Sequence, residues 1–337
     1  MFPTIHRSSG DDLNTLGYGT LSDCISCEVT EELNGAFTLE MTYPLKGTRS
    51  EYLLPGNIIE AVPSHNQRRQ PFRISQVRKS FANNAKVYAN HISYDLSGYP
   101  VKAANTYNSL DATFLAMNAM TWATGSADYH QFTFGKDFNS SASFSMPAIQ
   151  TLRSWMGGQE GSIIDVYGGE WVYDNYSCFL TSRRGQDTGF RISYGKNLAE
   201  YETQGDYTTY SHVCAYWKKS NVTVSGGLVS TGIEGPFRVA YVDASNAYET
   251  QPTTTTLDAF ATSYIQKTNF GVQTITITPA QIQDNIGLGD SVLICYETVF
   301  STRVVKTVWD VLAGAYTQME LGSKKVSIAE TIKSLVK

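Results

Sequence analysis

The feature that most constrains this 337-residue chain is a strand–loop–strand unit that occurs twice, near the two ends. Residues 56–80 open on a glycine, run through a short apolar strand and a basic polar loop, and end in a second strand. Residues 289–312 have the same layout, and Arg73 and Arg303 stand at equivalent places. A further strand follows each unit, AKVYANHI in one case and AYTQMELG in the other. We interpret this pattern as an internal duplication of a small antiparallel β unit.

The region around the first unit consists of strands and turns. In AFTLEMTY, residues 36–43, apolar and polar side chains alternate, which is typical of a strand with one buried face. The ELNG turn before it predicts a hairpin with SCEVTEE as the partner strand. Several antiparallel strands within so short a segment predict a small closed barrel over residues 1–98.

The rest of the chain divides by its periodicity. Residues 99–190 predict an α+β domain, with helices over 109–120 and 146–158 followed by two or three strands. Residues 191–222 and 287–322 predict a second, discontinuous β-barrel, interrupted by an α+β insert over 223–286 that carries a helix from 254. Residues 323–337 predict a C-terminal helix with an apolar stripe. The expected fold is therefore mainly β with α+β parts: two similar small antiparallel β-barrels plus two α+β insert regions.

Composition narrows the possible functions. Only 17% of the residues are charged, and the 21 tyrosines favour both strands and extensive protein–protein interfaces. The formal net charge is −5, and the densest basic cluster is Arg68, Arg69 and Arg73. A sequence-specific binder of duplex DNA needs a concentrated cationic face, so the composition argues against this class.

The cysteines and the termini indicate where the chain folds. The five cysteines are odd in number and widely spaced, which does not describe a disulfide framework and suits a reducing cytosol. Cys24 and Cys27 form a C-x-x-C motif, but in a strand side chains three apart point to opposite faces, and no second motif completes a zinc site. The N-terminus lacks the apolar core of a signal peptide, and no stretch reaches the length of a membrane span. We therefore expect a soluble protein without a membrane span or an export signal.

No catalytic constellation stands out. The five histidines lack metal-ligand spacing; they are His6, His65, His91, His130 and His212. His91 lies four residues before Asp95, which we interpret as an ordinary strand neighbour, and no G-x-S-x-G elbow is present.

Other chemically suggestive residues also have plainer interpretations. Glu31 and Glu32 should point to opposite faces of a strand, although a pair of catalytic carboxylates elsewhere stays open because their separation is set in three dimensions. RRGQDTG, residues 183–189, is interpreted as a hairpin turn, and the N-x-[ST] triplets at Asn139, Asn175 and Asn221 carry no weight without export. We therefore predict no catalytic, cofactor-binding or metal-binding residues and no cofactor.

Five longer motifs resemble a known family. They are VTEELNGAFTLEMTYPLKG, QPFRISQVRKS, VYANHISYDLSG, DNYSCFLTSRRGQDTGFRISYGKNL and VVKTVWDVLAGAYTQMELG. Together, over about residues 20–330, they resemble in order the N-terminal structural region of siphophage tail-tip proteins, a family also called prophage endopeptidase tail, tail-associated lysin or tail-hub protein. The resemblance implies a fold like the baseplate hub of contractile-tailed phages, with two similar β-barrels and two α+β regions in each subunit of a homotrimer.

The same resemblance implies a structural function in the virion tail tip, after folding in the cytoplasm of the bacterial host. A homotrimer with two barrels per subunit presents six barrels to a six-fold tail tube, which explains the duplication as a symmetry adaptation. The implied hub closes the distal end of the tube and opens for the tape measure and DNA at infection. Its implied partners are the distal tail protein and the tape measure protein, with tail-fibre or receptor-binding proteins beyond them and DNA only in transit.

Two alternatives come from other functional classes. The family name points to a peptidoglycan endopeptidase, but this sequence ends at Lys337, directly after the hub-like region and one helix, without a recognisable hydrolase domain. No catalytic residue is therefore carried over from the family. The tyrosine content also fits a host-receptor or saccharide-binding module.

Overall fold

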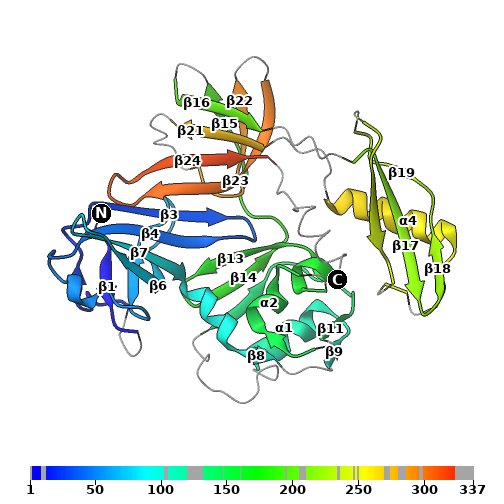
Figure 1. Cartoon of the computed structure of the whole chain (residues 1–337), viewed down its shortest axis with the longest axis horizontal. Helices are drawn as coiled ribbons and strands as arrows, with labels where there is room; N and C mark the ends of the chain where they lie inside the picture. The colour runs from blue at the N-terminus through cyan, green and yellow to red at the C-terminus, as the bar shows by residue number, and fades with distance from the viewer. Residues whose placement is uncertain are drawn as a thin grey trace. The chain divides into compact units, whose positions relative to one another are not determined.

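The computed structural model describes the chain in two compact units (Figure 1). The described residues are 2–8, 13–101, 105–119, 132–146, 148–159, 161–193, 196–204, 210–233, 236–245, 247–248, 250–268, 274–279, 286–295 and 299–322. The first unit contains residues 1–200 and 277–320, and the second contains residues 201–276 and 321–337. The predicted helix at 323–337 lies outside the described residues.

The N-terminal strands of the first unit form a contiguous antiparallel run, which we call the first repeat. In the order of their hydrogen bonding they are β3 (Ser26–Glu32), β4 (Phe37–Pro44), β7 (Asn84–His91), β6 (Gln70–Lys79), β5 (Ile58–Ala61), β1 (Thr4–His6) and β2 (Gly19–Thr20). The alternation predicted for β4 is present, because Phe37, Leu39, Met41 and Tyr43 are all buried. Short 3-10 helices, η1 (Ser50–Tyr52) and η2 (Ile92–Gly98), follow β4 and β7.

A second set of strands, which we call the second repeat, follows nearly the same order. It runs β16 (Leu198–Gln204), β21 (Thr274–Pro279), β24 (Ala315–Leu321), β23 (Val299–Asp310), β22 (Ser291–Cys295) and β15 (Asp187–Ser193). β3 corresponds to β16, β4 to β21, β7 to β24, β6 to β23 and β5 to β22. β23 also pairs with β3, so the two repeats are joined edge to edge in one sheet to which thirteen of the described strands belong. The expectation of a mainly β fold is confirmed.

The two predicted strand–loop–strand units have the same local geometry. Gly56 and Gly289 adopt φ values of 94° and 93°, a region that favours glycine. Each glycine N–H donates to the strand opposite, to the carbonyls of Ile74 and Val304 respectively, at 2.8 Å in both cases. Arg73 pairs in register with Ile58, and Arg303 pairs in register with Ser291. These matched contacts support the internal duplication.

Between the repeats lies a mixed segment of short helices and strands. Its helices are α1 (Leu110–Asn118), α2 (Leu152–Met156) and α3 (Ile163–Tyr167); its strands are β8 (Pro100–Val101), β9 (Asn105–Tyr107), β10 (Thr133–Lys136), β11 (Phe144–Met146), β12 (Gln150–Thr151), β13 (Glu170–Asp174) and β14 (Ser177–Thr181). The α1 prediction is confirmed, with Ser109 accepting from the Ala112 N–H as N-cap.

Two predictions in this segment were wrong. The helix expected over 146–158 begins only at Leu152, because Thr151 caps it and the preceding residues pair with β8. Residues 163–167 form helix α3 where strands were expected, because the Ser162 hydroxyl accepts from the Asp165 N–H and starts a helix.

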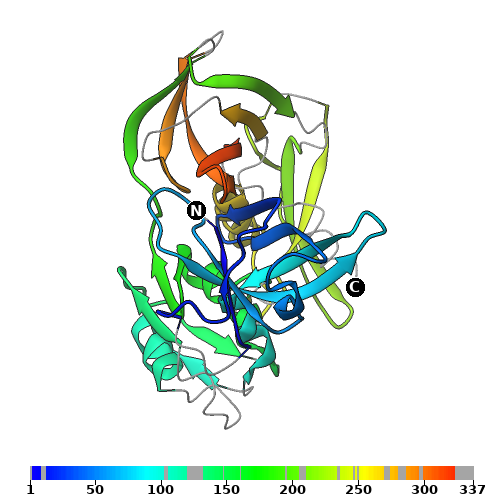
Figure 2. The same cartoon turned by 90° about the vertical axis from the view of Figure 1, so that its left-hand side faces the viewer.

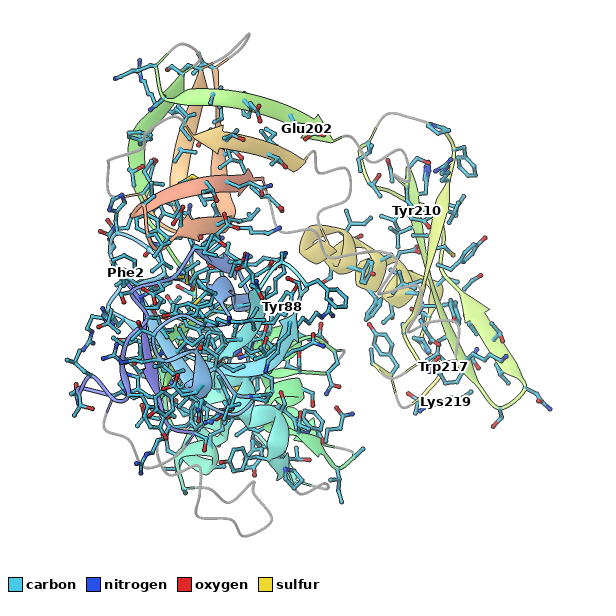
Figure 3. The ribbon with its side chains drawn as sticks, turned by 60° about the vertical axis from the view of Figure 1, so that its left-hand side comes forward. Phe2, Tyr88, Glu202, Tyr210, Trp217 and Lys219 are labelled. Atoms are coloured by element: carbon cyan, nitrogen blue, oxygen red, sulfur yellow. The ribbon has the colours of Figure 1, made fainter. Side chains whose placement is uncertain are left out.

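The second unit has a core of its own. Its sheet consists of β17 (His212–Lys219), β18 (Val222–Ser225), β19 (Val229–Ser230) and β20 (Val239–Asp243), and helix α4 (Thr254–Thr268) contributes Leu257 and Ala261 to the same core. Trp217, labelled in Figure 3, is buried in this core, and its indole N–H donates to the carbonyl of Tyr248. The helix predicted from residue 254 is confirmed.

One domain boundary needs correction. Residues up to 222 were expected to belong to the second barrel, but β17 pairs with β18, β19 and β20 instead. The apolar run of β17 would suit a strand in either sheet, so its composition could not identify its partners. The division of unit 1 into barrels stays a prediction. Among the described residues, no helix combines the length and the apolar composition that a membrane crossing requires.

Candidate functional site

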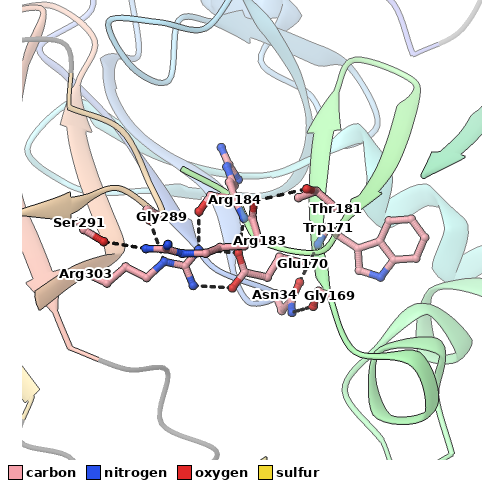
Figure 4. Close-up of polar contacts among 10 residues, drawn as sticks. All are labelled: Asn34, Gly169, Glu170, Trp171, Thr181, Arg183, Arg184, Gly289, Ser291 and Arg303. Carbon is pink, nitrogen blue, oxygen red and sulfur yellow. Dashed lines mark hydrogen bonds and ion pairs between the residues drawn. The ribbon is translucent and has the colours of Figure 1, made fainter. Parts of the chain in front are cut away.

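A densely bonded polar site in unit 1 joins the two repeats to the mixed segment, and we call it the junction (Figure 4). At its centre, the Arg303 guanidinium of β23 donates to both carboxylate oxygens of Glu170 at the start of β13, each at 2.6 Å. Both side chains are largely buried. Arg303 also donates to the carbonyls of Gly289, at 2.7 Å, and Arg184. A bidentate pair with further bonds fixes both position and angle, so Glu170 links β13 firmly to the second repeat.

Arg184 carries the junction to the first repeat. Its backbone N–H donates to Glu170 at 2.7 Å, and its guanidinium donates to Glu31 of β3 at 2.6 Å. Glu31 is only 3% exposed, and its other carboxylate oxygen accepts from Gln67 at 2.9 Å. A buried carboxylate needs such partners, because an unpaired buried charge is strongly unfavourable.

The tight turn between β3 and β4 makes a third connection. Asn34 adopts φ 50°, as asparagine does more readily than most residues. Its side chain donates to the Gly169 carbonyl at 2.9 Å and accepts from the Trp171 N–H at 2.8 Å. The turn therefore holds the beginning of β13 by a two-way backbone contact (Figure 4).

Close backbone approach completes the junction. A Cβ atom on Gly289 would lie 2.5 Å from the Arg184 carbonyl oxygen, so only glycine fits there. Asp290 next to it accepts from the backbone N–H groups of Gln186 and Gly287, both at 2.7 Å.

The equivalent arginine of the first repeat has a matching set of contacts. Arg73 donates to both carboxylate oxygens of Asp95 and to the Gly56 carbonyl at 2.7 Å. Its acidic partner comes from η2, directly after β7, whereas the partner of Arg303 comes from the mixed segment. The same arginine position therefore braces one repeat internally and holds the other repeat to its neighbour.

A second polar cluster ties the first repeat to the β13–β14 hairpin. Gln70 donates to Asp174 at 2.8 Å and accepts from the Asn175 N–H at 2.6 Å. The Ser93 N–H donates to His91 Nδ1, so the proton of this ring lies on Nε2 and points to Gln70. Burial, reinforced by the nearby Arg153 charge, holds the pKa of His91 well below its usual range. His91 is thus a neutral structural group.

A cleft of about 900 Å³ lies beside the junction. Several of its charged groups are paired, Arg184 with Glu31 and Arg68 with Asp174, and Asp290 accepts backbone N–H groups. Groups held in this way are suited to positioning chain segments rather than to acid–base chemistry. Within the described ranges, no group of three or more His, Cys, Asp and Glu side chains could hold a metal ion.

The residues singled out in the sequence are mostly dispersed. His6 pairs with Glu60, the His65 ring contacts Trp309 and Tyr316, and His212 belongs to unit 2, whereas His130 lies outside the described residues. Asp95 pairs with Arg73, so its spacing from His91 has no chemical meaning. Asn139, Asn175 and Asn221 all lie in loops or turns.

Two interpretations from sequence were wrong in an informative way. Arg183 and Arg184 were assigned to turn formation alone, but both bond to distant segments, as Arg183 donates to Ser291. Cys24 precedes β3 rather than lying in it, and a hydrogen bond with Cys24 and burial raise the pKa of the Cys27 thiol, so the two side chains are neighbours. Both thiols are free and buried.

Sequence reasoning missed Glu170, whose role becomes visible only when β13 meets β23. The pairing of Arg73 with Arg303 by pattern was the one available signal, because it marked an arginine that needs a carboxylate partner.

Comparisons with known proteins bear on the fold. No family model matches the chain, and no curated protein matches it by sequence. Among solved structures, a prophage tail protein from Listeria monocytogenes is similar with a TM-score of 0.61 at 14% identity, over 100% of this chain and 98% of that one. The 43 kDa tail protein of prophage MuSo2 from Shewanella oneidensis gives a TM-score of 0.58 at 12% identity, over 89% and 94% of the two chains. A tail protein from Neisseria meningitidis gives 0.55 at 11% identity, over 98% of both chains. The chain therefore has the fold of these prophage tail proteins, in agreement with the family resemblance of its sequence motifs.

Proposed function

We propose that this chain is a structural protein of a phage tail tip, where three copies form a hub that closes the distal end of the six-fold tail tube. The five sequence motifs and the similarity in fold to prophage tail proteins support this assignment. The observation that carries it is the way in which the two repeats are joined, because the same joint can be repeated between chains.

The internal joint is a backbone pairing of β23 with β3. Residues 306–310 pair antiparallel with residues 28–32, and Lys306 stands opposite Glu32 in this register. The Val311 N–H extends the pairing with a bond to the Cys27 carbonyl at 2.8 Å.

The equivalent edges of the other two strands carry no such partner within the described part of the chain. Beyond Arg73, β6 pairs with β7 alone, although it corresponds to β23. β16 corresponds to β3 and pairs with β21 alone. Free strand edges are normally protected, and pairing with another chain protects them. One copy thus offers a β6 edge and a β16 edge. These two edges could pair with each other as β23 pairs with β3, because β6 corresponds to β23 and β16 corresponds to β3.

Pairing of β16 in one copy with β6 in the next is a heterologous contact, which closes into a ring when the rotation allows it. Three copies then contribute six repeats, matching a six-fold tube. The joint within each chain and the joint between chains would be built alike.

The solvent-facing side of the β3–β4–β7 sheet suits a channel for DNA. Glu28 pairs in register with Glu40, which pairs with Tyr88, labelled in Figure 3. Threonines and Asn90 surround this row. Lys86 pairs with Glu40 on this face and Arg78 lies over the Tyr88 ring, so the face carries charges of both signs rather than the concentrated cationic surface that would retain a passing genome. In this proposal the tape measure and DNA pass through the ring, and the distal tail protein and tail-fibre or receptor-binding proteins are its neighbours.

Light scattering of the purified chain tests the proposal. We expect a mass three times that of the chain and ring-shaped particles by negative-stain electron microscopy. A monomer at every concentration, together with clearing of a cell-wall suspension by the chain alone, would favour an endopeptidase instead.

A further inference from the structure

The β6–β7 hairpin carries the most exposed large apolar side chain of the described residues. Phe81 at its tip is fully solvent-exposed, at 109% of the reference area. The flanking residues 78–80 and 82–83 are exposed as well, and Figure 2 shows the hairpin reaching out to this free tip. Single exposed apolar residues are common, so exposure alone identifies nothing.

Hydrogen bonds nevertheless close the base of this tip. The Ser80 N–H and hydroxyl both donate to the Asn84 carbonyl, and the Leu45 N–H donates to the Asn83 carbonyl at 2.8 Å. Asn83 adopts φ 58°, which closes the turn. Phe81 is therefore presented on a hydrogen-bonded turn, which suits a side chain that anchors an interface.

The second repeat shows what covers this position. Phe81 follows Arg73 by eight residues, and Val311 follows the equivalent Arg303 by eight residues. Val311 is only 2% exposed, and its N–H bonds to Cys27 of the first repeat. This position is thus buried at Val311, where β23 pairs with β3, and exposed at Phe81, where the β6 edge has no partner among the described residues.

The strands that would meet are also complementary in charge. β3 and β16 both contain seven residues, so aligning them end to end places Glu200 at the position of Glu28 and Glu202 at that of Thr30. In the internal joint, Thr30 lies opposite Val308, which corresponds to Arg78. Arg78 of one copy would then lie opposite Glu202 of the next, and opposite charges across a strand pair are favourable. Both side chains are exposed in the single chain, and Glu202 is labelled in Figure 3.

We propose that the β6–β7 tip is the anchor of the contact between copies of this chain, with Phe81 buried at the start of β16 of the neighbouring copy and Arg78 paired with its Glu202. This inference rests on the proposed trimer and specifies its interface. We expect the partner to be a second copy of this chain, because the β3 edge of the chain already covers Val311, the equivalent position in the second repeat.

The test compares Phe81→Ser with Phe237→Ser, since Phe237 is an exposed phenylalanine of unit 2 outside the proposed contact. Sedimentation equilibrium over a range of concentrations measures the assembly midpoint, and circular dichroism confirms folding. We expect Phe81→Ser to raise the midpoint concentration of assembly at least tenfold, and to leave the melting temperature unchanged at concentrations where the chains are monomeric. Phe237→Ser should leave both values unchanged.

A charge exchange tests the register independently. Arg78→Glu and Glu202→Arg should each weaken assembly, and the two changes together should restore it. If Phe81→Ser forms a trimer with the same midpoint as the wild-type chain, Phe81 is not the anchor, although the proposed trimer stands. Failure of the combined charge exchange to restore assembly would refute the Arg78–Glu202 pairing. A wild-type chain that stays monomeric throughout would remove the trimer and the anchor together.

Discussion

The substitutions Gly56→Ala and Gly289→Ala form a matched pair. The two glycines share a φ near 93° and the same hydrogen bond to the opposite strand. A Cβ atom in this conformation costs about 1–3 kcal/mol wherever it occurs. The conformational part of the penalty is therefore equal in the two variants, and any difference between them reports on what surrounds each glycine.

The surroundings differ sharply. A Cβ on Gly56 would meet only Ser8 Cβ, at 3.8 Å, which is an ordinary contact. A Cβ on Gly289 would lie 2.5 Å and 2.7 Å from the carbonyl oxygen and carbon of Arg184. The Arg184 backbone cannot withdraw without lengthening its bonds to Glu170 and Arg303. Overpacking of this kind adds about 1–3 kcal/mol. We expect Gly289→Ala to lower the free energy of unfolding by that much more than Gly56→Ala.

Urea unfolding followed by circular dichroism measures the difference between the variants, and hydrogen exchange locates it. The amide protons of Arg184 and Trp171 donate to Glu170 and Asn34, so they should exchange faster in Gly289→Ala and at the native rate in Gly56→Ala. Equal losses of stability in the two variants, with unchanged exchange at Arg184, would refute the idea that close backbone approach holds the junction.

Three further predictions concern single side chains. Glu170→Gln should cost about 1–3 kcal/mol in urea unfolding because it leaves a largely buried guanidinium without its charge partner, whereas Glu40→Gln in an exposed ion pair should not move the midpoint measurably. Burial lowers the pKa of His91 from its ordinary value of 6.5, so below about pH 6.5 the unfolded state takes up a proton that the folded state does not. The free energy of unfolding should therefore decrease as the pH is lowered, by up to about 1.4 kcal/mol per pH unit. His91→Gln should flatten this part of the measured pH profile; an unchanged slope would contradict the assignment. Burial raises the pKa of Cys178 to about 12, so iodoacetamide at pH 8 should modify the half-buried Cys295 and spare Cys178, as read by mass spectrometry.

The elements that sequence could predict are those fixed by local pattern. The alternation in residues 36–43, the capped helix at 110 and the helix from 254 depend on neighbours in the chain, and all three are present. The duplicated glycine and arginine were visible for the same reason, since each arginine donates to the carbonyl of the glycine that opens its own unit.

The elements that it could not predict depend on partners far along the chain. Glu170 meets Arg303 across 133 positions, and Arg184 meets Glu31 across 153. No local pattern marks a carboxylate as the partner of a distant guanidinium, so RRGQDTG was assigned to a turn. β17 shows the same limit, because its apolar run would fit either sheet and only the core around Trp217 decides between them.

The point in the sequence at which most of unit 2 is inserted, between β16 and β21, leads to a last prediction. In the first repeat, β3 and β4 are joined by the tight turn at Asn34, whereas the corresponding β16 and β21 are separated by residues 205–273. Those residues contain a separate core, which includes Val213, Trp217 and Leu257. An insertion at a hairpin tip leaves the strand order of its host unchanged. Replacing 205–273 by the Leu-Asn-Gly-Ala turn of residues 33–36 should therefore yield a folded chain whose urea midpoint matches that of unit 1 in the full chain. An insoluble or molten product would mean that the second repeat depends on unit 2 for its fold, and that the two repeats are less alike than their matched arginines indicate.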